Sequence, residues 1–309
     1  MNNYTAIFVL DIGLAATKPS FKGGQIQEFS CDGKIRRVLV GNQALPDGLA
    51  IDPDSKRMFW TCMGIPGKDD GAIYSANLDG HDIQTVVAPG VINTPKQLTL
   101  DPVARKLYFC DREGLRVCRC NFDGGDFTVL IQTGHYKDPQ DGKDAEKWCV
   151  GIAVAPQLGK FYWTQKGSSK GGQGRIFCAN IDTPYGQSPT SRGDVQCLLN
   201  NLPEPIDLEI DEASRTLYWT DRGELPIGNS LNSICLDRSG LPLPSDSSQG
   251  YNVLCRHLKE AIGLRLDVKN GHIYLTDLGG NIYRCNADGT GKRILHSDDL
   301  RAFTGISSL

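Results

Sequence analysis

The chain has 309 residues, of which 39% are hydrophobic, and a formal charge of −3 with acids and bases interspersed. This near-neutral, mixed charge excludes the basic footprint of a nucleic-acid-binding protein. No apolar run approaches the roughly 20 residues that a membrane-spanning helix needs, and the hydrophobic content is enough for one large all-β domain or two average ones.

A short aromatic strand pattern recurs along the chain. Its copies, in chain order, are IFVLDIG (7–13), MFWTCMG (58–64), LYFCDREG (107–114), FYWTQKG (161–167), LYWTDRGE (217–224) and IYLTDLGG (273–280). Measured at the position of the acid, the intervals are 51, 49, 54, 56 and 56 residues. A β-rich period of about 50 residues is typical of a propeller in which each repeat forms one four-stranded blade.

Each copy lies in the same local order of strands. A first strand such as DGLAIDP precedes it, a third such as IYRCNADG follows it, and a fourth completes the set. The first copy lacks a preceding strand, whereas the last residues, FTGISSL, resemble a first strand with nothing after it. We therefore expect the C-terminal strand (about 303–309) to pair with the N-terminal strand (about 6–11) and to close a ring.

The sequence thus predicts an all-β, six-bladed β-propeller with four antiparallel strands per blade and a single domain over 1–309. The expected blades cover 301–309 plus 1–42, 46–90, 94–134, 148–201, 204–258 and 261–298.

Loop lengths differ between the two faces of this wheel. The turns between first and second strands, such as PDSKR and EASRT, are short. The loops between second and third strands are long in several blades, as in CMGIPGKDDG and KGSSKGGQG. Long loops gathered on a rigid scaffold usually carry binding or chemistry, so we expect the functional site on that face.

Residues near the starts of the first strands should surround the axis on the long-loop face, with loop residues leaning over it. The expected catalytic residues are Lys166, Arg222, His135, Glu204 and Asp47. The expected substrate-binding residues are Met63, Thr94, Lys96, Tyr136, Trp148, Asp207, Glu260 and Phe303. A few charges among aromatic side chains and methionine suit an apolar organic small molecule better than a nucleotide, and we expect no metal, no cofactor and no nucleic-acid partner.

Structural roles for the same residues stay open. Arg222 and Lys166 would then pair with neighbouring acids on the rim, and Trp148 would plug the axis.

The chain has eleven cysteines, none of them in a Cys-x-x-Cys pair. Most lie within predicted strands, where a free thiol behaves as a small buried hydrophobic group. The alternative is cross-strand disulfides, for example Cys178 with Cys197 or Cys235 with Cys255, which need an oxidising compartment. The N-terminus shows no signal-peptide pattern, so we expect a cytoplasmic protein if Met1 is the natural start and a secreted one if a leader was removed.

The repeated motif, strongest at Leu217 to Asp221, resembles the Tyr-Trp-Thr-Asp propellers of the low-density-lipoprotein receptor and its relatives over essentially the whole chain. It departs from them at Cys62 and Gln165, where the motif acid is absent. This resemblance implies a module that binds a protein partner through one face of the wheel.

As a free-standing wheel the chain also resembles propellers of fungal secondary metabolism, hetero-Diels-Alderases that join a tropolone quinone methide to a humulene-type terpene. That resemblance implies an enzyme that joins two apolar partners, a reaction that needs a donor to the dienone oxygen. In the predicted pocket Lys166, Arg222 or His135 would be this donor. Glu204 or Asp47 would assist loss of water from a precursor. The apolar wall would comprise Trp148, Phe303, Tyr136 and Met63.

A metal-dependent lactonase of the gluconolactonase type is a further alternative with six blades. Its oxygen ligands would be Asp47, Glu204, Asp207 and Glu260. No asparagine falls at a matching inner-strand start, and the N-terminal glutamate motif of that family is absent. The resemblance to the fungal propellers makes the cofactor-independent cycloaddition our leading hypothesis.

Overall fold

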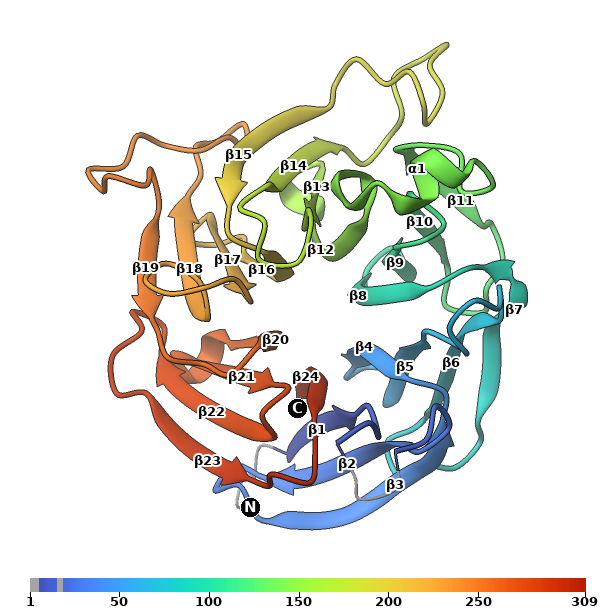
Figure 1. The fold of residues 1–309 in the computed structure, drawn as a ribbon, viewed down its shortest axis with the longest axis vertical. Helices are drawn as coiled ribbons and strands as arrows, with labels where there is room; N and C mark the ends of the chain where they lie inside the picture. The colour runs from blue at the N-terminus through green and yellow to red at the C-terminus, as the bar shows by residue number, and fades with distance from the viewer. Residues whose placement is uncertain (1–5, 16–18) are drawn as a thin grey trace.

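The structure is a computed structural model that describes residues 6–15 and 19–309. Its strands form six four-stranded antiparallel sheets, arranged as blades around a central axis (Figure 1). The six-bladed propeller predicted from the repeats is confirmed.

We number the blades I to VI, beginning with the sheet that contains β1. Blade I contains β24 (Phe303–Ser308), β1 (Ala6–Asp11), β2 (Gly24–Ser30) and β3 (Ile35–Gln43). Blade II contains β4 (Pro46–Asp52), β5 (Arg57–Cys62), β6 (Gly71–Asn77) and β7 (Gln84–Ile92). Blade III contains β8 (Pro95–Asp101), β9 (Lys106–Asp111), β10 (Arg116–Asn121) and β11 (Thr128–Gln132).

The other half of the wheel repeats this order. Blade IV contains β12 (Cys149–Ala155), β13 (Lys160–Gln165), β14 (Gly174–Asn180) and β15 (Gln196–Leu202). Blade V contains β16 (Pro205–Asp211), β17 (Thr216–Asp221), β18 (Ser230–Cys235) and β19 (Asn252–Cys255). Blade VI contains β20 (Ala261–Asp267), β21 (His272–Asp277), β22 (Asn281–Asn286) and β23 (Arg293–Ser297).

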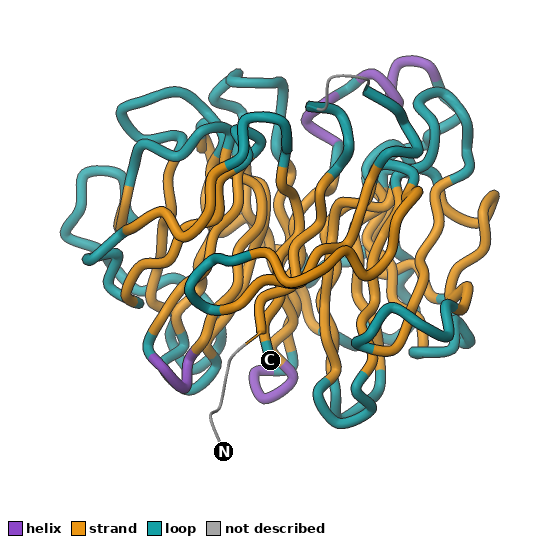
Figure 2. The backbone as a smooth tube through the Cα atoms, turned by 90° about the horizontal axis from the view of Figure 1, so that it is seen from below, coloured by secondary structure: helices purple, strands orange, loops and turns teal. Residues whose placement is uncertain are grey.

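The short helical segments lie in the connections. They are α1 (Pro139–Lys143) and the 3-10 turns η1 (Ala145–Lys147), η2 (Pro156–Leu158) and η3 (Val268–Asn270). In the side view, α1 and η1 lie on one face of the propeller, and η2 and η3 lie on the opposite face (Figure 2). Among the residues that the structure describes, no helix has the length and apolar character to cross a membrane.

The ring closes through β24 and β1. These strands pair antiparallel, with Ile7 opposite Ser308 and Val9 opposite Ile306. This closure gives the sheet of blade I the same four strands as its neighbours, as the sequence predicted.

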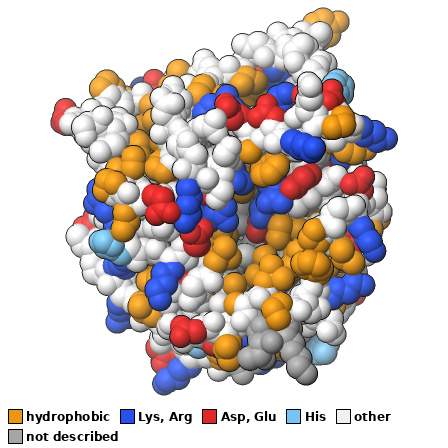
Figure 3. Space-filling view, in the orientation of Figure 1, with side chains coloured by type: hydrophobic (Ala, Val, Ile, Leu, Met, Phe, Trp, Pro, Cys, Tyr) orange, Lys and Arg blue, Asp and Glu red, His pale blue; other side chains and the backbone are white. Residues whose placement is uncertain are grey.

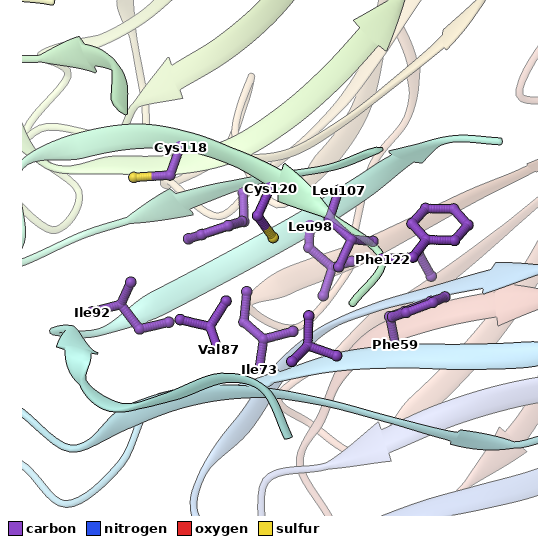
Figure 4. Packing of buried hydrophobic residues seen from close by; sticks show 12 residues of the cluster. Phe59, Ile73, Val87, Ile92, Leu98, Leu107, Cys118, Cys120 and Phe122 are labelled. Carbon is purple, nitrogen blue, oxygen red and sulfur yellow. The ribbon is translucent and has the colours of Figure 1, made fainter. Parts of the chain in front are cut away.

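The aromatic strands fill the space between blades. Trp60, Trp163 and Trp219 are almost completely buried. Between blades II and III, Ile73 and Val87 of one blade pack with residues of the next such as Leu98 (Figure 4). Burying an aliphatic or aromatic side chain stabilises the folded state by roughly 1.5–3 kcal/mol, so these contacts hold neighbouring blades together.

One side chain links each blade to the next. In four blades it is the motif threonine, in blade III it is Cys110 at the same motif position, and in blade I it is Thr304 of β24. Thr61 Oγ1 accepts a hydrogen bond from the Gly48 N–H of its own blade at 2.8 Å and donates to the Lys96 carbonyl of the next blade at 2.8 Å. The donor and acceptor residues at the other boundaries are Cys110 and Gly151, Thr164 and Ile206, Thr220 and Ile262, Thr276 and Thr304, and Thr304 and Pro46. Every blade boundary thus has one bond from a side chain to the main chain.

The acid of the motif fixes the start of the inner strand. Asp221 accepts hydrogen bonds from the main-chain N–H groups of Glu204 at 3.1 Å and Gly223 at 2.8 Å. Asp111 does the same for the N–H of Thr94 at 2.7 Å. Burial raises the pKa of Asp221 to about 7. The motif acid is therefore part of the scaffold, which explains its repetition at the end of an aromatic strand.

All eleven cysteines are free, and most of them are buried. Cys197 lies opposite Phe177 in the sheet, and Cys178 lies opposite Gln196. The structure therefore has the buried free thiols that we expected and neither of the alternative disulfides.

Candidate functional site: the axial cavity

A cavity of about 450 Å³ opens at the axis, and residues of the long β5–β6 loop form part of its wall. Its lining includes Ile12, Leu45, Asp47, Met63, Thr94, Lys96, Arg112, Glu113, Tyr136, Arg222, Ile262, Leu278 and Thr304. This volume falls within the roughly 300–1,000 Å³ of pockets that bind organic ligands.

The second residue of each inner strand lies near the axis. Those of β4, β8, β20 and β24 line the cavity, namely Asp47, Lys96, Ile262 and Thr304. Those of β12 and β16, Val150 and Ile206, pack with Ile262 in a small apolar cluster. Each blade therefore contributes one side chain from the same strand position.

The residue directly after each aromatic strand forms a second set at the mouth. Blades III, IV and V contribute Arg112, Lys166 and Arg222. Blades VI, I and II contribute Leu278, Ile12 and Met63. We call the side of the mouth formed by blades III, IV and V the cationic half. The side formed by blades VI, I and II is the apolar half. Figure 3 shows charged side chains on one side of the central hollow and hydrophobic side chains on the other.

Asp47 and Lys96 form an ion pair inside the cavity. Lys96 Nζ lies 2.7 Å from Asp47 Oδ1 and 3.2 Å from Met63 Sδ. Gln97 Nε2 donates to Asp47 Oδ2 at 3.2 Å. Burial lowers the pKa of Lys96, and the neighbouring Asp47 carboxylate opposes this effect. The pair places an ammonium donor beside a carboxylate acceptor within reach of a ligand.

Glu204 holds two cations behind the cationic half. Its Oε1 accepts hydrogen bonds from Lys166 Nζ at 3.0 Å and from Arg222 Nη2 at 2.5 Å. Burial raises the pKa of Glu204, but Arg222 and Lys166 outweigh this and hold the pKa below its usual value. Burial lowers the pKa of Lys166. Arg222 lines the cavity and is the cation of this group that a ligand can touch.

Trp148 lies between two cations of the mouth. The Arg112 guanidinium carbon is 5.2 Å and Lys166 Nζ is 5.4 Å from its ring centroid. The indole N–H donates to the Gly142 carbonyl at 3.1 Å, which fixes the ring. Each cation–π contact is worth about 0.5–2 kcal/mol. Trp148 therefore positions the cationic half.

Ten of the thirteen predicted site residues lie in or beside the cavity, in three groups. Those that line the cavity are Asp47, Met63, Thr94, Lys96, Tyr136 and Arg222. Lys166, Glu204 and Trp148 lie directly behind the lining. Glu260 Oε2 lies 3.5 Å from Arg222 Nε at the rim.

The remaining three lie elsewhere, and their predicted roles need correction. Phe303 is the first residue of β24 and is fully buried, with its ring centroid 6.1 Å from that of Phe29. Neighbouring residues of a strand face opposite sides, so Phe303 packs inside the wheel and Thr304 reaches the cavity.

Asp207 is buried and accepts hydrogen bonds at 2.9 Å from the N–H groups of Leu208 and Leu264. Burial raises its pKa well above the usual value, and the side chain links the inner strands of blades V and VI. His135 is an exposed loop residue whose N–H donates to Asp141 Oδ2 at 2.8 Å. Neither lines the cavity, because Asp207 binds main-chain N–H groups of two blades and His135 lies in an exposed loop.

The carboxylates of the lactonase alternative do not converge. Asp47 is paired with Lys96, Glu204 with Lys166 and Arg222, and Asp207 with main-chain N–H groups. Within residues 6–15 and 19–309, no group of three or more His, Cys, Asp or Glu side chains is placed to hold a metal ion.

The comparison with known proteins places the chain among fungal proteins. No family model matches it. A protein of Pyricularia oryzae named low-density lipoprotein receptor-related protein 1 is 44% identical over 306 residues, covering 97% of each chain. The chain belongs to the family of this fungal protein.

A second fungal relative is longer than the present chain. The protein of Cochliobolus heterostrophus named 3-hydroxyacyl-CoA dehydrogenase-like protein LAM1 is 47% identical over 303 residues, which cover 97% of our chain. The chain spans 64% of the length of LAM1, so the name of LAM1 describes a larger protein.

Solved structures share the fold at low identity. A chain of a nidogen/laminin complex matches with a TM-score of 0.71 and 18% identity over 98% of both chains. TolB from Acinetobacter baumannii matches with a TM-score of 0.64 and 11% identity, covering 99% of our chain and 66% of TolB. The family member is thus a six-bladed propeller of the Tyr-Trp-Thr-Asp type.

Sequence reasoning missed several lining residues of this propeller, chiefly Ile12, Arg112, Glu113, Ile262 and Leu278. The signal was available for three of them. Met63, Lys166 and Arg222, which we predicted as loop residues leaning over the axis, each directly follow an aromatic strand. The same place in the other copies is held by Ile12, Arg112 and Leu278. Ile262 is the second residue of β20, the same place that Asp47 and Lys96 hold in β4 and β8.

Proposed function

We propose that the protein is a cofactor-independent enzyme that binds apolar organic substrates carrying an electron-rich oxygen in the axial cavity. The observation that carries this proposal is the division of the mouth into an apolar half and a cationic half. A hydrocarbon part would pack against Ile12, Leu45 and Met63, while Arg222 faces the oxygen. Such a division fixes the direction in which an amphipathic substrate enters.

The reaction we favour is an intermolecular hetero-Diels-Alder addition of a tropolone quinone methide to a humulene-type terpene. Two bonds form. The exocyclic carbon of the quinone methide bonds to one alkene carbon, and its oxygen bonds to the other. No atom is lost and no electron is gained or removed. The protein need only hold both partners in register and stabilise charge on the oxygen as it develops.

Of the donors predicted from the sequence, Arg222 has the required position. It lines the cavity, whereas Lys166 lies behind it and His135 lies in an exposed loop. A hydrogen bond from a charged donor contributes about 1.5–3 kcal/mol, which corresponds to roughly a tenfold to hundredfold change in rate. Arg222 is therefore the proposed oxygen donor.

The Asp47–Lys96 pair suits the formation of the quinone methide. Loss of water from a hydroxymethyl precursor needs a base for the ring hydroxyl proton and an acid for the leaving hydroxyl. Asp47 would accept the first proton and Lys96 would supply the second, and the two groups are 2.7 Å apart. The net product is one water molecule and the reactive quinone methide.

Binding of a protein partner is the second candidate. It is favoured by the structural match to a chain of a nidogen/laminin complex and by the receptor-related name of the Pyricularia oryzae relative. In that case the mouth would be a docking surface, and mixed organic substrates would give no product above the uncatalysed rate.

The test is product formation from a hydroxymethyl tropolone precursor and humulene, followed by chromatography and mass spectrometry. We expect adduct only with protein, no loss of rate with a chelator, and a fall in kcat/KM of roughly tenfold to a hundredfold in Arg222→Gln. Met63→Ala should raise KM by about fivefold with kcat nearly unchanged, since it removes apolar binding area.

The matched control is Arg293→Gln, because Arg293 is exposed on the outer strand β23, away from the cavity. Equal rates with and without protein would exclude this cycloaddition, and a rate abolished by chelator would contradict an enzyme that works without a metal.

A further inference from the structure

The loop that joins β13 to β14 extends over the cationic half. We call residues 167–173, Gly-Ser-Ser-Lys-Gly-Gly-Gln, the strap. Figure 1 shows this connection above the inner strands β12 and β16. Gly167 and Gly172 have φ angles of +72° and +66°, in the left-handed region that favours glycine. The strap thus has a permissive residue near each end.

The underside of the strap covers the Lys166–Glu204 pair. The Lys170 N–H donates to Glu204 Oε2 at 3.0 Å, and Lys166 Nζ donates to the Gly167 carbonyl at 3.1 Å. The side chains of Lys166 and Glu204 are only 6% and 0% exposed. The strap therefore contributes to the burial of both charged groups.

The side chain of Lys170 fastens the strap by charge, beside a main-chain hydrogen bond of 3.2 Å from the Gly172 N–H to the Pro203 carbonyl. Lys170 Nζ lies 2.7 Å from Glu224 and 2.9 Å from Glu260. The strap sequence contains no aliphatic or aromatic side chain that could anchor it in the core. The three side chains are 38%, 65% and 36% exposed, and ion pairs in such positions are worth only about 0.2–1 kcal/mol and weaken with salt.

Glu260 contacts both Lys170 of the strap and a residue that lines the cavity. Its Oε1 binds Lys170, and its Oε2 lies 3.5 Å from Nε of the cavity residue Arg222. Arg222 also binds Glu204, which in turn accepts the Lys170 N–H. The strap and the proposed oxygen donor therefore share the same two carboxylates.

We propose that the strap is a latch that opens when the side chain of Lys170 leaves Glu224 and Glu260 and its N–H leaves Glu204, and that opening admits Lys166 and Glu204 to the cavity. This inference rests on the proposed function, because joining two organic molecules needs more room than one ligand. The closed cavity of about 450 Å³ lies toward the lower end of the range for single drug-sized ligands. Opening the strap enlarges the mouth on the side where the oxygen donor lies.

Limited trypsin digestion without any substrate tests the latch. Cleavage after Lys170 gives fragments 1–170 and 171–309, and an open strap exposes this bond. Glu224→Gln combined with Glu260→Gln should increase the cleavage rate at Lys170 by about threefold to tenfold, because two exposed ion pairs are lost. High sodium chloride should increase it in the wild type. Cleavage at the exposed Lys137 serves as the internal reference, and Lys170→Arg keeps both the charge and the tryptic site.

Unchanged relative cleavage in the double variant and in salt would overturn the latch. Should the double variant unfold, hydrogen exchange of residues 167–173 in the wild type gives the same answer, with faster exchange expected in salt. Because neither measurement uses a substrate, the latch and the cycloaddition fail separately: fast cleavage with no product contradicts only the proposed function.

Discussion

The two halves of the cavity mouth come from one position of the repeat, the residue directly after the aromatic strand, and differ in the side chain at that position. On the cationic half, Arg222 and Lys166 need the buried Glu204 as a partner. On the apolar half, Ile12, Leu45 and Met63 pack together without any partner of opposite charge. The difference shows that one backbone frame supports either character, but buried charge makes the cationic half dependent on each of its members.

The largest effect should come from removing the shared carboxylate. Glu204→Gln leaves Lys166 buried and uncompensated, so the free energy of unfolding should fall by about 3–5 kcal/mol. Urea denaturation measures this loss. The matched control is Glu224→Gln, an acid whose side chain is 65% exposed and whose removal should leave unfolding nearly unchanged. Replacing both partners, as Glu204→Leu with Lys166→Met, should recover most of the loss. A fall no larger than that of the control would show that the two halves do not differ in this way.

A smaller effect is expected on the apolar half. Ile262→Ala removes a side chain that is 5% exposed and packs with Val150 and Ile206. The free energy of unfolding should fall by about 2 kcal/mol, near the lower end of the range for buried Ile→Ala changes. Val103→Ala is the control, because Val103 is 93% exposed. Thermal unfolding of both variants tests the point, and a loss equal to that of Glu204→Gln would remove the distinction between the halves.

The smallest effect is the pH dependence of the cationic half. Burial raises the pKa of Glu113, but its contacts with Arg112 outweigh this and hold the pKa below the usual value. A carboxyl group with a lowered pKa in the folded state stabilises the protein above its unfolded pKa, and this contribution is lost as pH falls through the folded pKa. Glu113→Gln should therefore lose less stability than the wild type below about pH 4.5, by under about 1 kcal/mol. Parallel urea curves at pH 6 and pH 3 measure it; identical curves would leave Glu113 without a role in acid stability.

The wheel could be predicted from the sequence because its signal is repeated. The aromatic strand recurs in every blade, and FTGISSL completes the first blade, so both blade number and ring closure were correct. The cavity was predicted only in part, since its lining depends on which residue of a strand start points inward. Phe303 and Thr304 illustrate this: a shift of one position moves a side chain from the blade core to the axis.

Contacts between distant loops were beyond sequence reasoning. Lys170 meets Glu224 and Glu260 only because blades IV, V and VI lie side by side, and no local pattern in the strap indicates those partners. Trp148 was predicted to contact the substrate, yet it lies between two cations that come from different blades. Such contacts follow from the closed ring and not from spacing along the chain.

The hydrogen bonds that cross each blade boundary have a consequence for how this architecture can diversify. They end on main-chain carbonyls, such as that of Lys96, and so do not depend on the side chains that face the cavity. The bonds between blades hold the ring together, whereas the side chains that face the cavity determine its ligand preference. Substitutions of the side chains that line the cavity can therefore change which ligand binds, while the number and spacing of the blades stay the same.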